Sequence, residues 1–402
     1  MYIARNIEKH FKSSSHFFPV MLLTGARQVG KTTFLRHIAG KKRKYVTLDD
    51  PLNCQNAKND PRSFLQNFSP PVMIDEIQYA PELLPYIKMI VDEDRSPGSF
   101  WLTGSQQFHM MKGVSESLAG RVGIVDLMGL SNRECQSLSS SPFLPETFTC
   151  SSKMKQLSVP EFYARIWQGS FPQIALGSAA HWQSFYSSYV QTYLERDVRA
   201  LTQVGDINRF LNFLRAAAAR TGSLLNYSDL SRDADISVPT AKSWLSILQA
   251  SGLVYLLHPY YRNITRRIVQ TPKLYFMDTG LCAYLTEWKT PDVLAAGAMA
   301  GAFFESWCFA EIMKSYCHNG QQAPFYFYRD HNLREVDLII EQNGTLYPVE
   351  FKKTASPKSD DAKNFIALKQ LKMPIGMGAV VCLYPKITKL RDDCRIIPAP
   401  ML

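Results

Sequence analysis

The sequence predicts an α/β protein in three parts: an N-terminal α/β domain, a helical middle segment and a second α/β domain. Short apolar segments alternate with helix-like patterns from residue 19 to about 130, which is typical of a mostly parallel sheet flanked by helices. Residues 161–260 show helical periodicity without strand alternation, and strand-like segments return after Pro272. The predicted boundaries are 1–137 for the first domain, 138–160 for a Ser/Pro-rich linker, 161–268 for the helical and winged-helix segment and 269–402 for the last domain.

Composition and charge narrow the class of protein. The sequence has no run of 18 apolar residues, and its start lacks the apolar core of a signal peptide, so we expect a cytoplasmic protein without membrane contact. None of the eight cysteines forms a CxxC pair or lies near a histidine cluster, which argues against a zinc site. The net charge of +10 suits a polyanionic partner without requiring one.

Five apolar segments are predicted to form the sheet of the first domain: FPVMLLTG (18–25), KRKYVTLD (42–49), PPVMIDE (70–76), GSFWLTGS (98–105) and GIVDLMGL (123–130). The first segment leads into GARQVGKT, which matches GxxxxGK[ST], and a helix-like segment follows at once. In such a loop the backbone N–H groups turn toward phosphates, a lysine ammonium lies near the β and γ oxygens and a threonine hydroxyl can bind Mg²⁺. The residues predicted to bind ATP are Gly25, Arg27, Gln28, Val29, Gly30, Lys31, Thr32, Thr33 and Asp75.

Residues at the ends of later strands complete the predicted ATP site. We expect Asp75 to hold Mg²⁺ together with Thr32, and Glu76 to polarise the attacking water; a solvated strand end is the alternative. Ser105 can orient that water, although an ordinary turn explains it equally well. Arg121 is a candidate for neutralising charge during phosphoryl transfer, from the same chain or a neighbouring subunit of an oligomer. A surface salt bridge explains Arg121 equally well.

The middle segment contains a predicted winged-helix unit. Ser237 can cap a helix from Val238 to Ala250, and Gly252 can end it. The predicted core of this unit consists of Leu230, Trp244, Leu245 and Leu248. If the unit binds DNA, the residues expected at the groove are Thr240, Lys242, Ser243 and Ser246, and those expected on phosphates are Arg262, Arg266 and Arg267. The alternative is a unit that packs only against its own chain.

An acidic and basic pair marks the last domain. Glu350 and Lys352 of LYPVEFKK point the same way from a predicted strand, because residues two apart share a face. An Asn-Gly turn is expected to pair this strand antiparallel with EVDLII and to bring Asp337 to the pair. Glu305 lies among apolar residues of a predicted helix, where a carboxylate without a partner is costly.

Such a set of residues is typical of a metal-dependent phosphodiesterase. We expect the carboxylates of Asp337 and Glu350 within about 6 Å of one another and bound to Mg²⁺ or Mn²⁺. Lys352 would stabilise charge at the phosphorus atom, and Glu305 would complete the site. The alternative is a structural ion-pair cluster in a fold that has lost catalysis.

These motifs together resemble a family of prokaryotic AAA-type ATPases joined to a C-terminal domain of unknown function with a restriction-endonuclease-like PD-(D/E)xK core. The segments that carry the resemblance are LTGARQVGKTTFL, VMIDEIQYAPELL, LTGSQQF, SLAGRV, YVQTYLERDVRAL, LLNYSDLS, PKLYFMDTGLCAYL, EVDLII and PVEFKK. Ala26 stands where the family loop often has proline, at a position that does not touch phosphate chemistry. The resemblance implies an ATP site at Gly30, Lys31, Thr32, Asp75 and Glu76 and a nuclease-like site at Glu305, Asp337, Glu350 and Lys352.

Three hypotheses for the function follow. The first is an ATPase with a metal-dependent nuclease domain that acts on DNA under the control of nucleotide state. The second is an ATP-regulated switch that binds DNA or protein through a nuclease fold without catalysis. The third is a chaperone-like ATPase that binds a protein partner through the aromatic helix predicted at residues 182–201.

Overall fold

The computed structural model describes residues 2–41, 43–104, 114, 117–177, 179–193, 207–261 and 270–402. Contacts within the chain divide it into two compact units, which we describe separately. Unit 1 comprises Met1–Gly129, Ala250–Gly252 and Cys317–Gly320, and unit 2 comprises Leu130–Gln249, Leu253–Tyr316 and Gln321–Leu402. Four predicted site residues lie outside the described ranges: Ser105, Arg262, Arg266 and Arg267.

Unit 1 contains a parallel sheet in the order β2-β3-β4-β1-β5. Its strands are β1 (Val20–Thr24), β2 (Lys44–Thr47), β3 (Val72–Asp75), β4 (Phe100–Thr103) and β5 (Val122–Asp126). The first four predicted apolar segments of the first domain therefore each contain a strand of this sheet, and the fifth overlaps β5, which begins one residue earlier. Since the strands are parallel, their carboxyl ends share one edge, and the residues that follow β1, β4 and β3 are neighbours there.

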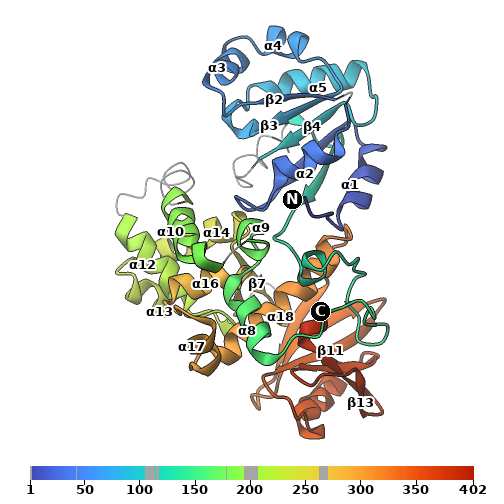
Figure 1. Ribbon diagram of the computed structural model, residues 1–402, viewed down its shortest axis with the longest axis vertical. Coiled ribbons are helices and arrows are strands. Elements are labelled where there is room, and N and C mark those ends of the chain that lie inside the picture. Colours follow the sequence, from blue (N-terminus) through green and yellow to red (C-terminus); the bar gives the residue numbers. More distant parts are fainter. Residues whose placement is uncertain are drawn as a thin grey trace. The chain divides into compact units, whose positions relative to one another are not determined.

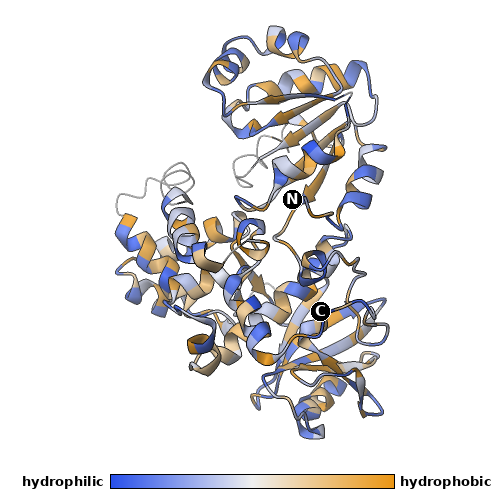
Figure 2. Ribbon diagram, in the orientation of Figure 1, coloured by the Kyte–Doolittle hydropathy of each residue, from blue (hydrophilic) through white to orange (hydrophobic). Residues whose placement is uncertain are grey.

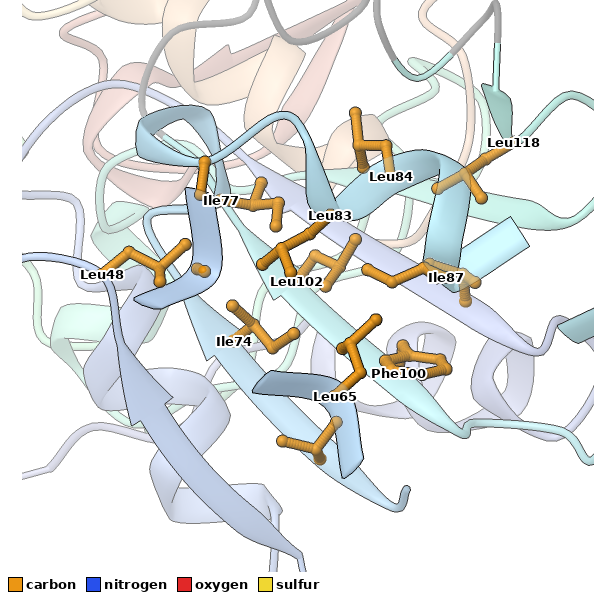
Figure 3. Close-up of a cluster of buried hydrophobic side chains, with 14 of the residues drawn as sticks. Leu48, Leu65, Ile74, Ile77, Leu83, Leu84, Ile87, Phe100, Leu102 and Leu118 are labelled. Carbon is orange, nitrogen blue, oxygen red and sulfur yellow. The ribbon is translucent and has the colours of Figure 1, made fainter. Parts of the chain in front are cut away.

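Helices cover both faces of this sheet (Figure 1). They are α1 (Glu8–Ser15), α2 (Lys31–Ile38), α3 (Pro51–Asn59), α4 (Pro61–Asn67) and α5 (Leu83–Glu93), with a 3-10 turn at Ile77–Tyr79. On one face, residues of β1, β3 and β4 form a buried cluster with Leu65 of α4 and Ile87 of α5 (Figure 3). On the other, Phe11 of α1 packs edge to face on Phe34 of α2 and on Trp101. The strands are accordingly the most hydrophobic part of this unit (Figure 2).

Unit 2 begins with helices, as predicted for the middle of the chain. They are α7 (Asn132–Cys135), α8 (Val159–Gln168), α9 (Pro172–Ala175), α10 (Trp182–Tyr193), α12 (Ile207–Ala218), α13 (Tyr227–Asp233) and α14 (Val238–Ala250). Among the described residues later in the chain are the helices α16 (Thr279–Leu285), α17 (Pro291–Ala296) and α18 (Ala300–Cys317). Most side chains of α18 are buried, so this helix forms the centre of the unit.

A small sheet accompanies α13 and α14. Its strands are β6 (Ser223–Leu224), β7 (Val254–Leu257) and β8 (Lys273–Phe276), and β8 lies antiparallel between the other two. Ser237 caps α14, because its hydroxyl accepts a hydrogen bond of 3.2 Å from the backbone N–H of Thr240. The predicted core residues are buried, and Lys242, Ser243 and Ser246 are exposed on α14. The sequence predicts that the segment of β8 belongs to the last domain, but its backbone pairs with β6 and β7.

The last part of the chain forms a six-stranded sheet in the order β13-β14-β12-β11-β10-β9. Its strands are β9 (Phe325–Arg329), β10 (Glu335–Gln342), β11 (Thr345–Lys352), β12 (Gly378–Cys382), β13 (Thr388–Arg391) and β14 (Cys394–Pro398), with a 3-10 segment at Ser359–Leu371. The predicted Asn-Gly turn joins β10 to β11: Asn343 has φ 51° and Gly344 has φ 74°, the left-handed values that a tight hairpin requires. The register pairs Leu338 with Val349 and so sets Asp337 opposite Glu350.

Two expectations about the middle of the chain need correction. The predicted linker packs into unit 2: Phe143 and Phe148 are buried, and the Tyr316 hydroxyl donates a 2.8 Å hydrogen bond to the carbonyl of Phe143. In the described part of the helix expected at 182–201, Phe185 and Tyr186 of α10 are buried against the aromatic rings of their own unit, so this face is not an interaction surface. Residues 194–201 lie outside the described ranges. Within the described residues, no helix has the length and apolar character needed to span a bilayer.

Candidate functional site

The predicted phosphate loop follows β1 and ends in α2. Gly30 begins the helix at φ 94°, and Gly25 has φ 137°. A Cβ atom at Gly25 would lie 2.2 Å from the carbonyl oxygen of Leu127, so this loop tolerates only glycine there. The first turn of α2 has no side-chain cap, which leaves its backbone N–H groups directed at the loop. Uncapped N–H groups at a helix start, with a lysine beside them, form an anion site.

Lys31 supplies the cation of this site. Its side chain is buried, and its ammonium donates hydrogen bonds of 2.9 Å to the carbonyls of Gly25 and Ala26. Burial lowers the pKa of Lys31, while the carboxylates of Glu76 and Asp126 act to raise it. The charge is thus compensated by acidic groups around the loop, and phosphate oxygens are stronger acceptors for it than the two carbonyls.

Asp75 at the end of β3 is a hydrogen-bond centre. It accepts from the hydroxyls of Thr32 at 2.9 Å and Tyr45 at 3.1 Å, and from the hydroxyl of Thr103. The predicted pair of Thr32 and Asp75 is therefore brought together across the sheet edge. Sequence reasoning missed Tyr45 and Thr103; the available signal was that both lie on strands adjacent to β3 in the sheet.

Glu76 occupies a left-handed backbone conformation, with φ 59°. Its backbone N–H donates a 3.0 Å hydrogen bond to the hydroxyl of Thr103, and its carboxylate accepts from the amide of Gln78. A non-glycine residue at positive φ is costly and persists where the surroundings fix it. Thr103 and Gln78 thus hold the carboxylate of Glu76 beside the loop.

Two arginines are held away from the phosphates of the loop, and for Arg121 the structure shows the salt bridge that was the predicted alternative. Arg121 precedes β5 at its amino end and pairs with Asp92 at 2.5 Å, so it lies at the sheet edge opposite the loop of its own chain. Arg5, which sequence reasoning missed, is buried and donates to the carbonyls of Val29 at 3.1 Å, Met128 at 2.7 Å and Gly129 at 3.2 Å. Arg5 therefore ties the phosphate loop to the segment that follows β5.

The C-terminal candidates meet in unit 2. The carboxyl groups of Asp337 and Glu350 share a hydrogen bond. Lys352 donates a 3.1 Å hydrogen bond to Glu350, and the backbone N–H of Phe351 donates one of 3.0 Å to Asp337. Glu305 reaches the same cluster from α18. The predicted approach of the two carboxylates is thus present on the paired strands β10 and β11.

A lysine that we did not predict lies among these acids. The ammonium of Lys273, from β8, is 2.5 Å from Glu335, 3.2 Å from Glu305 and 3.5 Å from Asp337, and its side chain is 4% exposed. The Tyr275 hydroxyl, two residues along the strand, donates a 2.6 Å hydrogen bond to Glu305. The period of two that identified Glu350 and Lys352 also applies to Lys273 and Tyr275 in KLYF and was the missed signal.

The acids of this cluster differ in the direction in which their pKa is shifted. Burial raises the pKa of Glu305 to about 7, with Asp337 adding to the rise. Burial also raises the pKa of Glu350 well above its usual range. Burial acts to raise the pKa of Asp337 too, but Lys273 and the hydrogen bond with Glu350 outweigh it and hold this pKa low. Within this pair Glu350 is therefore the weaker acid and Asp337 the stronger one.

The two sites differ in how well they fit a metal ion. Thr32 and Asp75 offer hard oxygen ligands side by side, which suits Mg²⁺. Across the described part of the chain, no group of three or more acidic, histidine or cysteine side chains has an arrangement that holds a metal. In the C-terminal cluster, Lys273 lies between Glu305 and Asp337, so the residues present do not fit the predicted Mg²⁺ or Mn²⁺.

Three protein-family models match the chain. One is described as an AAA domain and covers residues 18–136. Two are described as domains of unknown function, DUF8612 over residues 159–292 and DUF4143 over residues 300–402.

Known proteins match over most of the length. The uncharacterized proteins Mb2031c of Mycobacterium bovis and Rv2008c of Mycobacterium tuberculosis are each 31% identical over 363 residues, 88% of this chain and 74% of theirs. Among solved structures, the Walker-type ATPase PABY2304 of Pyrococcus abyssi matches with a TM-score of 0.43 at 16% identity, over 69% of this chain and 94% of its own. RuvB of Thermotoga maritima matches with a TM-score of 0.30 at 16% identity, over 63% and 89%.

Proposed function

Because the chain belongs to one family with the two mycobacterial proteins and has an AAA domain at residues 18–136, we propose that unit 1 binds and hydrolyses ATP with Mg²⁺. The observation that supports this most is the meeting of Thr32 with Asp75 beside the buried ammonium of Lys31. A cation, an uncapped helix start and two hard oxygen ligands within one loop region are what a magnesium nucleotide requires.

Each residue of the site has a proposed role. The loop from Gly25 to Thr33 surrounds the phosphates with backbone N–H groups, and Lys31 moves its hydrogen bonds from backbone carbonyls to the β and γ oxygens. Thr32 and Asp75 hold Mg²⁺, which withdraws charge from the phosphates. Glu76 orients and polarises the attacking water from a backbone position fixed by Thr103.

An arginine from a neighbouring copy is a further proposal. Arg121 is turned toward Asp92 at the edge opposite the loop, so it cannot serve the site of its own chain. If the protein forms an oligomer, Arg121 of one copy would leave Asp92 to face the γ-phosphate held by the next. An Arg121→Ala variant that hydrolyses ATP at a concentration-independent, wild-type rate would exclude this role.

Two substitutions test the ATP site. Lys31→Ala should abolish ATP hydrolysis and weaken nucleotide binding at least tenfold, because the loop has no other ammonium for the β and γ oxygens. Glu76→Gln should still bind ATP but hydrolyse it at least a hundredfold more slowly, since an amide cannot act as a base. Binding is measured with a fluorescent ATP analogue and turnover by phosphate release. Wild-type turnover in Glu76→Gln would refute the assignment of Glu76.

For unit 2 we propose a nuclease-like fold that binds without cutting, under control of the ATPase. The order of α18, β9, β10, β11, the 3-10 segment and β12, together with Asp337 opposite Glu350, supports the nuclease-like arrangement. Lys273 among the carboxylates supports the absence of a metal centre, and hence of metal-dependent cleavage. An active Mg²⁺- or Mn²⁺-dependent nuclease with Asp337, Glu350 and Lys352 as catalytic residues is the rival function.

DNA is the proposed ligand of unit 2. The small sheet order β6-β8-β7 with α13 and α14 supports a winged-helix arrangement, and the exposed Lys242, Ser243 and Ser246 give α14 a polar face. A basic net charge of +10 favours a polyanion. The rival partner is a protein.

The experiment compares duplex DNA binding and cleavage with ATP, with ADP and without nucleotide, in the presence of Mg²⁺ or Mn²⁺. We expect DNA binding that depends on nucleotide and falls steeply with salt, a smaller salt slope in Lys242→Ala, and intact DNA after incubation. Cleavage that disappears in Asp337→Ala would instead establish the active nuclease. No DNA binding under any nucleotide condition would favour a protein partner.

A further inference from the structure

The surroundings of Lys273 are not explained by any role described above. Its ammonium is almost fully enclosed, with 4% of the side chain exposed, and acidic groups from two other elements reach it. Glu305 comes from α18, and Glu335 and Asp337 come from β10. The ammonium donates hydrogen bonds to Glu305 and Asp337 and forms an ion pair with Glu335.

We propose that Lys273 is the built-in cation of the carboxylate cluster and takes the place that a divalent ion holds in a nuclease of this arrangement. This inference rests on the second proposal above, a nuclease-like fold without a metal centre. The inference depends on one conflict: the acids suit Mg²⁺ or Mn²⁺, but a lysine already lies among them. Lys273 of β8 supplies the positive charge that a metal-dependent nuclease obtains from a bound divalent ion.

The position of Lys273 is fixed by its backbone. Residue 273 pairs with Leu257 of β7 on one side and with Leu224 of β6 on the other. Tyr275 adds a second anchor, since its ring stacks on Phe309 of α18 with the ring centres 4.2 Å apart. Pairing on both sides therefore fixes the backbone position from which the Lys273 side chain reaches the acids.

The charge balance explains why a divalent ion is excluded. Arg329 also contacts Glu335, at 3.8 Å, and Lys352 contacts Glu350, so the cluster already receives three cations from its own chain. Burying acidic groups without such compensation is costly, whereas a divalent ion added beside Lys273 would meet a like charge within the same ligand shell. Removing the lysine should therefore have two effects at once: loss of stability and a gain of affinity for divalent ions.

The test uses full-length protein without nucleotide and follows Mn²⁺ binding by electron paramagnetic resonance and thermal unfolding in Mn²⁺ against EDTA. The variants are Lys273→Met, Lys273→Met with Asp337→Asn, and Lys353→Met as the matched control. Lys353 directly follows β11 and donates a hydrogen bond to the carbonyl of Ala295. Its replacement therefore removes a lysine that lies outside the cluster.

We expect wild type and Lys353→Met to show no Mn²⁺ site that depends on Asp337. Lys273→Met should unfold at a lower temperature in EDTA, recover part of the loss in Mn²⁺ and bind Mn²⁺ at least tenfold more tightly than wild type. Adding Asp337→Asn should remove that gain. No gain in Lys273→Met, or a gain that survives Asp337→Asn, would overturn the inference.

Further outcomes separate this inference from the proposal on which it rests. If Lys273→Met does not fold, wild type and Asp337→Asn decide: a Mn²⁺ site present in the first and lost in the second overturns the inference, and none in either supports it. Mn²⁺ uptake at Asp337 in the wild-type protein, without DNA cleavage, refutes the inference alone. If DNA binding is absent with ATP, with ADP and without nucleotide, the function proposed for unit 2 is refuted, but the role of Lys273 is not affected.

Discussion

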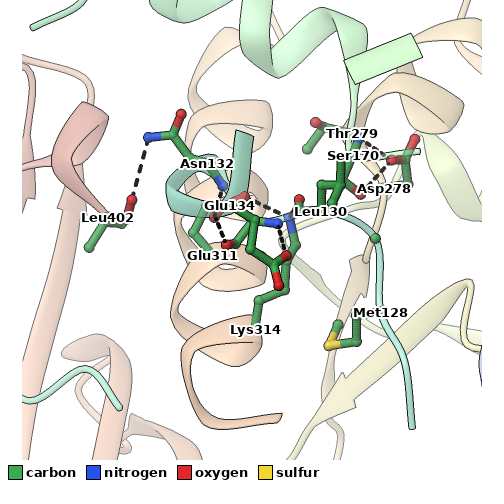
Figure 4. Close-up of polar contacts among 12 residues, drawn as sticks. Met128, Leu130, Asn132, Glu134, Ser170, Asp278, Thr279, Glu311, Lys314 and Leu402 are labelled. Atoms are coloured by element: carbon green, nitrogen blue, oxygen red, sulfur yellow. Dashed lines mark hydrogen bonds and ion pairs between the residues drawn. The ribbon is translucent and has the colours of Figure 1, made fainter. Parts of the chain in front are cut away.

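Replacing Lys314 with methionine should destabilise unit 2 by about 3–5 kcal/mol, because it strands a buried carboxylate. Lys314 and Glu311 lie one turn apart on α18, both 3% exposed, with 2.6 Å between their charged groups (Figure 4). The ammonium also donates to the carbonyl of Leu130 at 3.0 Å, and the carboxylate accepts from the backbone N–H of Asn132 at 2.8 Å. Each partner is therefore needed where the chain enters unit 2.

A second substitution separates charge from packing. Adding Glu311→Gln to Lys314→Met removes the stranded charge and keeps an acceptor for the N–H of Asn132. The carbonyl of Leu130 and the new amide N–H group then lack partners, but a neutral group left without a partner costs less than a stranded carboxylate, so the double variant should be more stable than Lys314→Met.

Guanidinium unfolding followed by tryptophan fluorescence measures this difference. Five of the six tryptophans lie in unit 2, so the signal reports mainly on that unit. A loss below 1 kcal/mol in Lys314→Met, or a double variant less stable than the single one, would refute the reasoning from a buried ion pair.

Three further predictions concern the loop and the acidic cluster. Gly25→Ala should lose ATP binding in a fluorescent-nucleotide assay, because its Cβ would lie 2.2 Å from the carbonyl oxygen of Leu127; normal binding would mean that the loop can shift. Arg5→Met should raise the KM for ATP at least fivefold while changing kcat less, because the carbonyl of Val29 loses its donor; an unchanged KM would make Arg5 a packing residue only. Glu305 has a folded pKa of about 7 against an ordinary 4.5, so the folded state holds its proton more tightly and unfolding free energy should fall between pH 4.5 and 7. Glu305→Gln should flatten that fall in urea titrations across the range, and an unaltered slope would assign it to other groups.

Local patterns allowed the sequence to predict the ATP loop. The residues from Gly25 to Thr32 are contiguous, and the strand before them and the helix after them are fixed by short-range periodicity. The pairing of Asp337 with Glu350 was also predictable, since an Asn-Gly turn sets the register of a hairpin.

Partners that come from distant segments were out of reach. Lys273 meets Glu305 and Asp337 across 32 and 64 residues of chain, through packing of a small sheet on α18 that no local period encodes. The aromatic stripe of α10 suggested an interaction face. An amphipathic pattern indicates that one face of a helix is buried, but it does not show whether the same chain or a partner buries it. Arg5 was missed for a related reason, since its three acceptors are backbone carbonyls that any residue type supplies.

The origin of Lys273 in β8 limits how this protein can be divided. A fragment that begins at Ala300 retains Glu305, Glu335 and Asp337 but leaves their ammonium behind on the other piece. The last α/β region is therefore not an exchangeable module, even though its sheet is complete. A chimaera that transplants it into a relative has to carry residues 273–299 as well, or to accept a host strand with a lysine in the same register.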